Sequence, residues 1–135
     1  MAAFKIQPKT NTFKAQVSFK DIDDNGRSIR HSIEMEFKRL TRKSYDSVLS
    51  TVETPKDEDG EPIKLSGEER LELDADLVMG LVTNWQIQDA VGEPFPFSRD
   101  NVLVMLDSYP SLAVAVVLTA ASKLNGELAR KNSST

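Results

Sequence analysis

The sequence predicts an α+β fold in which an N-terminal antiparallel β-hairpin or small sheet packs on a C-terminal bundle of about three to four helices. Apolar and polar residues alternate over residues 13–19 and 29–37, and this period of two is typical of half-buried strands. Later segments repeat their apolar residues every three or four positions, as helices do. With 135 residues, 39% of them hydrophobic, the chain (1–135) is most simply a single domain around one core.

The register of the hairpin follows from its turn, which contains the strong turn signal of residues 23–26. A two-residue turn would place Val17 opposite Glu34 and would bury charge, because a slip of one residue exchanges the two faces of a strand. A three-residue loop instead pairs Val17 with Ile33 and puts Gly26 at the left-handed position of a type I turn with a bulge. We therefore favour the three-residue loop.

Two helices are expected in the middle of the chain. Thr41 can cap the first, which should end at Thr54-Pro55, since proline disfavours helix in the residue before it. Ser66 and Glu69 match a capping box for the second helix. Its apolar stripe has helical spacing and predicts a helix that reaches as far as the tryptophan; the stripe consists of Leu71, Ala75, Val78, Val82 and Trp85.

Two further helices follow a link over residues 89–97, where two prolines and a glycine favour a reversal of the chain. Ser98 is a suitable N-cap for the first of them. Pro110 fits the first turn of the second, which carries the apolar run Leu112–Leu118.

Three segments are expected to be loosely held because they are polar and rich in charge or proline. They are an N-terminal arm (1–12), a mobile acidic linker (53–66) and a frayed C-terminal tail (129–135).

Composition argues against several functions. A net charge of -4 disfavours broad nucleic-acid binding. No apolar stretch is long enough for a signal peptide or a membrane span. Without cysteine there is no thiolate metal site or cysteine nucleophile, and His31 is the only histidine. We therefore predict no catalytic residue, no metal site and no cofactor, and we expect a protein that is not an enzyme.

The candidate partner-binding residues lie on the apolar helical half of the chain. Trp85 can be a core residue or an interface anchor. The run Leu112–Leu118 is apolar all around its helix, so this helix is either buried centrally or keeps one face for a partner. The candidates are Trp85, Leu112, Val114, Val116 and Leu118.

The order of these elements resembles that of the tail assembly chaperones of long-tailed bacteriophages and prophages. The resemblance covers most of residues 13–128 and is most specific in two parts. These are Phe37-Lys-Arg-Leu-Thr41 and the stretch Trp85–Pro110, which includes Asp89-Ala-Val-Gly-Glu-Pro-Phe-Pro-Phe-Ser98. The chain departs from the pattern at Asn84, where glycine is expected, and at Ala90-Val91, where an acidic turn residue is common.

The resemblance implies a protein that binds the tape measure protein, keeps it soluble and helps the tail tube protein polymerise around it. Self-association is compatible with this role. The protein would act in the cytoplasm of the host bacterium and be absent from the mature virion. The competing functions are a structural tail or head-completion component that remains in the virion, or a generic adaptor domain.

Overall fold

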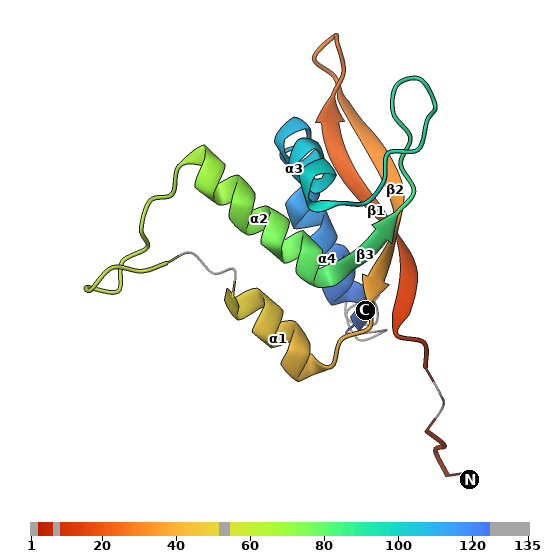
Figure 1. Cartoon of the computed structure of the whole chain (residues 1–135), viewed down its shortest axis with the longest axis vertical. Coiled ribbons are helices and arrows are strands. Elements are labelled where there is room, and N and C mark those ends of the chain that lie inside the picture. Colours follow the sequence, from red (N-terminus) through yellow and green to blue (C-terminus); the bar gives the residue numbers. More distant parts are fainter. Residues whose placement is uncertain (1–2, 7–8, 52–54, 125–135) are drawn as a thin grey trace, which may run out of the picture.

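The computed structural model describes residues 3–6, 9–51 and 55–124 (Figure 1). Within these residues, an antiparallel sheet of three strands in the order β1-β2-β3 is combined with four helices, which confirms the α+β fold class. The elements are β1 (Thr12–Ile22), β2 (Ser28–Lys38), α1 (Arg42–Thr51), α2 (Gly67–Leu81), β3 (Val82–Trp85), α3 (Arg99–Ser108) and α4 (Leu112–Leu124). Helix α2 is central among the helices, since it packs against α1, α3 and α4.

The hairpin of β1 and β2 has the predicted register. Val17 lies opposite Ile33 and Phe19 opposite His31. Gly26 has a φ of 77°, in the left-handed region, and its N–H donates to the Asp23 carbonyl. The three-residue loop is therefore confirmed.

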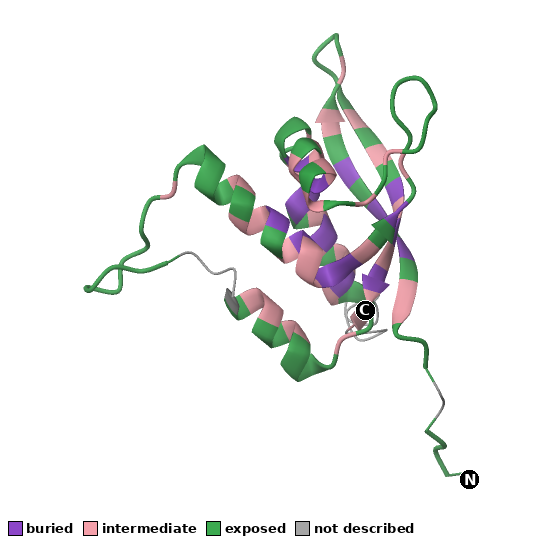
Figure 2. Cartoon of the chain, in the orientation of Figure 1, coloured by how far each residue is buried: buried purple, intermediate pink, exposed green. Residues whose placement is uncertain are grey.

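One face of this sheet forms half of the hydrophobic core (Figure 2). Alternate residues of β1 and β2 are buried beneath the helices, and the residues between them remain on the polar outer face. The buried residues of β1 and β2 are Ala15, Val17, Phe19, Ile33, Met35 and Phe37, and β3 adds Val82 and Trp85. They meet the buried residues of α2, α3 and α4 in one cluster.

The prediction that the second helix reaches Trp85 is wrong. Helix α2 ends at Leu81, and the chain continues as β3, which pairs with β2 and places Trp85 opposite Met35. The Val82 N–H still donates to the Val78 carbonyl, so the helix closes normally before the backbone turns extended. The segment joins the sheet because β2 offers an unpaired edge and because β-branched Val82 and Thr83 suit a strand.

The expected helix caps are present. The Thr41 hydroxyl accepts a bond from the Ser44 N–H at the start of α1. Ser66 and Glu69 form the full capping box of α2. The predicted end of α1 at Thr54-Pro55 lies partly outside the described residues, as does the whole tail 129–135.

Helices α3 and α4 follow the predicted order. Ser98 caps α3 and accepts a bond from the Asn101 N–H. Helix α4 begins at Leu112, two residues later than predicted, so Pro110 precedes the helix and does not lie in its first turn.

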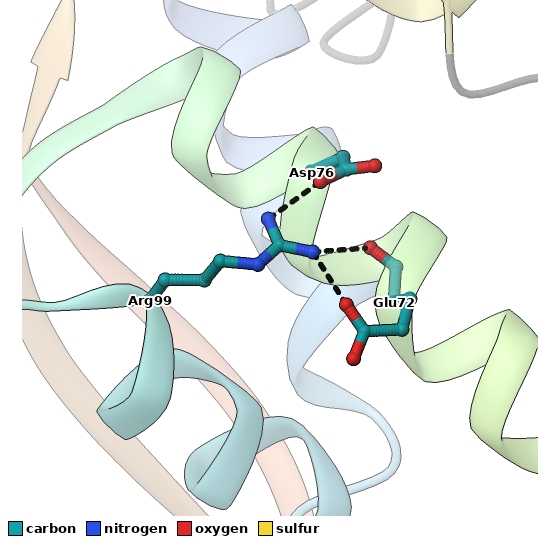
Figure 3. Close-up of polar contacts among 3 residues, drawn as sticks. All are labelled: Glu72, Asp76 and Arg99. Carbon is teal, nitrogen blue, oxygen red and sulfur yellow. Dashed lines mark hydrogen bonds and ion pairs between the residues drawn. The ribbon is translucent and has the colours of Figure 1, made fainter.

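An ion-pair network joins the first turn of α3 to α2 (Figure 3). The Arg99 guanidinium donates to the carboxylates of Glu72 and Asp76, which lie one turn apart on α2. The two acceptors raise the pKa of Arg99. Because all three side chains are partly exposed, the network orients the helices more than it stabilises them.

The same turn occurs three times among the described residues. In each copy an aspartate carboxylate accepts bonds from the N–H groups two and four residues later, and a glycine with positive φ follows three residues after the aspartate. The copies begin at Asp23, Asp57 and Asp89. The second and third also share the sequence Asp-x-x-Gly-Glu-Pro. The predicted linker thus contains a defined turn, while its mobility stays a prediction.

Candidate partner-binding site

Trp85 is a core residue that also binds the loop after β3, over residues 86–97, to the core. Only 5% of its surface is exposed. Its indole Nε1–H donates to the Phe95 carbonyl at 2.7 Å, its ring stacks on Phe95, and Phe97 meets it edge-on. A side chain enclosed in this way cannot anchor a partner unless the loop over residues 86–97 first opens.

The four candidates on α4 separate onto two faces. Leu112 and Val116 are buried in the core, whereas 62% of Val114 and 64% of Leu118 are exposed. Residues four apart lie on the same side of a helix, so the two exposed side chains form one apolar strip directed away from the core. The structure therefore combines both expectations for this helix: one side is core and the other is open.

Val114 and Leu118 line a groove of about 540 Å³ between α4 and β1. Ala115 and Phe19 contribute to its apolar lining, and polar strand residues form its other wall. These polar residues include Gln16, Ser18, Lys20 and Arg30. They were not among the residues proposed from sequence.

Two cations lie side by side at this groove. Lys20 of β1 is directly opposite Arg30 of β2, a pairing of like charges that destabilises a sheet by a few tenths of a kcal/mol or more. Neither side chain has an ion-pair partner among the described residues. This pair could have been predicted from the sequence, because the correct hairpin register already places residues 20 and 30 opposite each other.

The strand wall of the groove is an open sheet edge, since β1 is the outer strand. Alternate residues of an antiparallel strand direct their N–H and C=O groups toward the partner or away from it. The Arg39 N–H donates to the Asn11 carbonyl, so odd-numbered residues face β2 and even-numbered residues face the open edge. A hydrogen bond from outside the sheet agrees with this orientation. Ser111, just before α4, donates its hydroxyl to the edge-facing carbonyl of Lys20 at 2.7 Å.

His31 has a structural setting. It lies against the rings of Phe19 and Tyr109, and its Nε2 is 3.0 Å from the Asp21 carboxylate. The Ile22 N–H and then His31 lower the pKa of Asp21 through hydrogen bonds. The predicted register, which pairs Val17 with Ile33, also places His31 opposite Phe19.

The described residues hold neither a cluster of metal ligands nor a single helix that could span a membrane. They contain no group of three or more His, Cys, Asp or Glu side chains able to hold a metal ion. No single helix among them has the length and apolarity to cross a membrane; α3 and α4 would do so only as a pair, and they meet at a bend of 110°.

Comparison with known proteins supports the resemblance noted above. No curated protein sequence and no solved structure matches the chain. The profile of a family described as phage tail assembly chaperone, however, matches residues 1–131. The match includes the groove, both its helix wall and its strand wall. Because it spans almost all of the 135 residues, this chain belongs to the phage tail assembly chaperone family.

Proposed function

We propose that this chaperone binds an amphipathic helix of the tape measure protein in the groove between α4 and β1. By covering the apolar face of that helix, it would keep the tape measure protein soluble and help the tail tube protein polymerise around it. It would act in the host cytoplasm and leave before the virion is complete. The observation that carries the proposal is the exposed strip of Val114 and Leu118 on a helix whose other side is core.

The chemistry of the groove supports a helical partner with acidic residues beside its apolar face. In helix-in-groove binding, a partner helix inserts a few apolar anchors, spaced three or four residues apart, into a hydrophobic groove, and Val114 and Leu118 supply apolar lining for such anchors. Lys20 and Arg30 add two positive charges at the strand wall, and neither has an ion-pair partner in the part of the chain that the structure describes. A chain with a net charge of -4 thus presents its apolar groove beside a local positive patch, which favours acidic partners.

The test is co-expression of the tape measure protein with single variants of the chaperone. Val114→Asp and Leu118→Asp place a charge in the groove, and each should weaken binding by about 5- to 150-fold, since a hydrophobic contact of this kind is typically worth about 1–3 kcal/mol. The soluble fraction of the tape measure protein should fall accordingly. Val104→Asp is the matched control, because Val104 is also an exposed valine, on α3.

Circular dichroism should show that all three variants remain folded, since none of these side chains is buried. Trp85, Leu112 and Val116 are unsuitable for the test because their loss would unfold the core. If both groove variants keep the tape measure protein as soluble as the control does, the groove is not its binding site. Detection of the chaperone by mass spectrometry in purified virions would instead favour a structural component of the tail.

A further inference from the structure

The segment before β1 carries two large apolar side chains in water. Phe4 is 88% exposed and Ile6 is 89% exposed. Lys5 separates them, so Phe4 and Ile6 share one face of an extended chain. A strand of this kind can cover a hydrophobic surface with one face, yet residues 3–6 belong to none of the strands in Figure 1.

The segment is held away from the groove of its own molecule. Arg39 donates from its side-chain Nε–H to the Thr10 carbonyl and from its backbone N–H to the Asn11 carbonyl, both at 2.8 Å. These bonds direct the chain out past the start of β1, and Figure 1 shows it pointing away from α4. To reach the groove in its own molecule, the segment would have to reverse within a few residues and give up these bonds.

The open edge of β1 offers hydrogen bonds to an incoming strand. The Ser111 hydroxyl already donates a hydrogen bond to one group of this edge, the Lys20 carbonyl. Among the described residues, no side chain or strand bonds to the edge-facing N–H and C=O groups of Gln16 and Ser18. Such an edge readily accepts a further strand from another chain.

We infer that residues 3–6 of a second copy of this chain add to β1 as a fourth strand and seal the groove. A strand at this edge has its alternate residues on opposite faces of the sheet. Phe4 and Ile6 then lie on the helix side, against Val114 and Leu118, while Lys5 lies on the polar face. Each copy has both a segment to donate and an edge to receive it, so the contact can close as a reciprocal dimer.

This contact between two copies has a consequence for binding of the tape measure protein, and that consequence rests on the proposed function. The donated segment and a helix of the tape measure protein would occupy the same groove, so they would compete. Free chaperone would protect its apolar strip by self-association and would expose it as the tape measure protein is bound.

Sedimentation velocity over a range of concentrations tests the inference on the full chain. The wild-type protein should sediment as a larger species as its concentration rises. The double variants Phe4→Asp/Ile6→Asp and Val114→Asp/Leu118→Asp should each remain monomeric. A Val91→Asp/Val104→Asp variant, which changes two exposed valines elsewhere, should associate like the wild type.

Mixing the two monomeric variants gives the sharpest test. One retains an intact segment and the other an intact groove, so the mixture should form a heterodimer although neither variant associates alone. Ser18→Pro adds a test of strand pairing: it removes an edge-facing N–H without removing a bond to β2. This variant should remain monomeric but should still solubilise the tape measure protein, because a docked helix does not need that N–H.

The inference is overturned if the wild type is monomeric at all concentrations, or if its association survives the Phe4→Asp/Ile6→Asp change. A mixture without heterodimer also overturns it. None of these results depends on the tape measure protein, whereas the proposed function fails only if the groove variants still solubilise that protein.

Discussion

At the scale of single residues, Asp74 shows how burial and charge oppose each other. It lies on α2 beside a depression that Leu106 and Pro110 of the neighbouring segment also line. Burial raises the pKa of its carboxyl group above the ordinary value of 3.8, and the positive charge of Arg70 opposes part of this effect. The ionised carboxylate is therefore less favourable in the folded chain than in the unfolded chain.

We expect Asp74→Asn to stabilise the protein at neutral pH by up to about 1 kcal/mol. The folded pKa is raised, so the ionised group disfavours folding at neutral pH; below 3.8 the carboxyl is protonated in both states and the gain should disappear. Urea unfolding at the two pH values measures the difference. Asp76→Asn is the control and should lower the stability at neutral pH, since it breaks the ion pair with Arg99. A gain that persists in acid would contradict burial as the cause.

At the scale of elements, the packing of α1 on α2 depends on a glycine. A Cβ atom added at Gly80 would lie 2.7 Å from the Cγ1 of Val48 on α1, well inside van der Waals contact. Valine is restricted at χ1, so it cannot easily turn away. Gly80 therefore lets the two helices approach, although alanine is intrinsically the better helix former by about 1 kcal/mol.

Gly80→Ala should accordingly destabilise the wild-type protein by roughly 1 kcal/mol or more, as overpacking does. In a Val48→Ala background the clash is absent, and the same change should be neutral or stabilising. A double-mutant cycle of urea unfolding measures this coupling, which we expect to be about 1–3 kcal/mol. Additive effects would show that α1 moves aside without cost.

At the scale of the whole molecule, two turns with the same hydrogen bonds differ in how they are attached. The turn from Asp89 is fastened to the core, because Phe95 packs on Trp85 and accepts its indole bond. The turn from Asp57 lies at the end of an extended loop, and Figure 2 shows that loop almost wholly exposed. Local geometry is equal in the two turns, so any difference in their stability comes from tertiary contacts.

Hydrogen exchange should report this difference. The Asp57 and Asp89 amides donate equivalent bonds, to the carbonyls of Glu61 and Glu93 at 2.8 Å. We expect the Asp57 amide to exchange at least about tenfold faster, because less of the structure must open to release it. Both should exchange faster than the amides of residues 71–81. Equal protection of the two turns would mean that the loop over residues 55–65 is held by contacts that the structure does not show.

The features that the sequence determined are those set by neighbours along the chain. The hairpin register follows from strand alternation together with the position of Gly26. The capping side chains of Thr41, Ser66 and Ser98 accept hydrogen bonds from residues three positions later in the chain. The cation pair at the groove was predictable from the same register. In each case the interaction that decides the structure lies within one element or one turn.

Tertiary structure decided what the same patterns leave open. Val82 and Trp85 have helical spacing with Leu71, Ala75 and Val78, but the unpaired edge of β2 draws them into the sheet, where both are still buried. Burial of apolar surface does not depend on the type of secondary structure, so the pattern could not distinguish the two outcomes. In the same way, an evenly apolar α4 does not reveal which side remains open. The packing of α4 against both β1 and α2 decides that Leu112 and Val116 are core while Val114 and Leu118 line the groove.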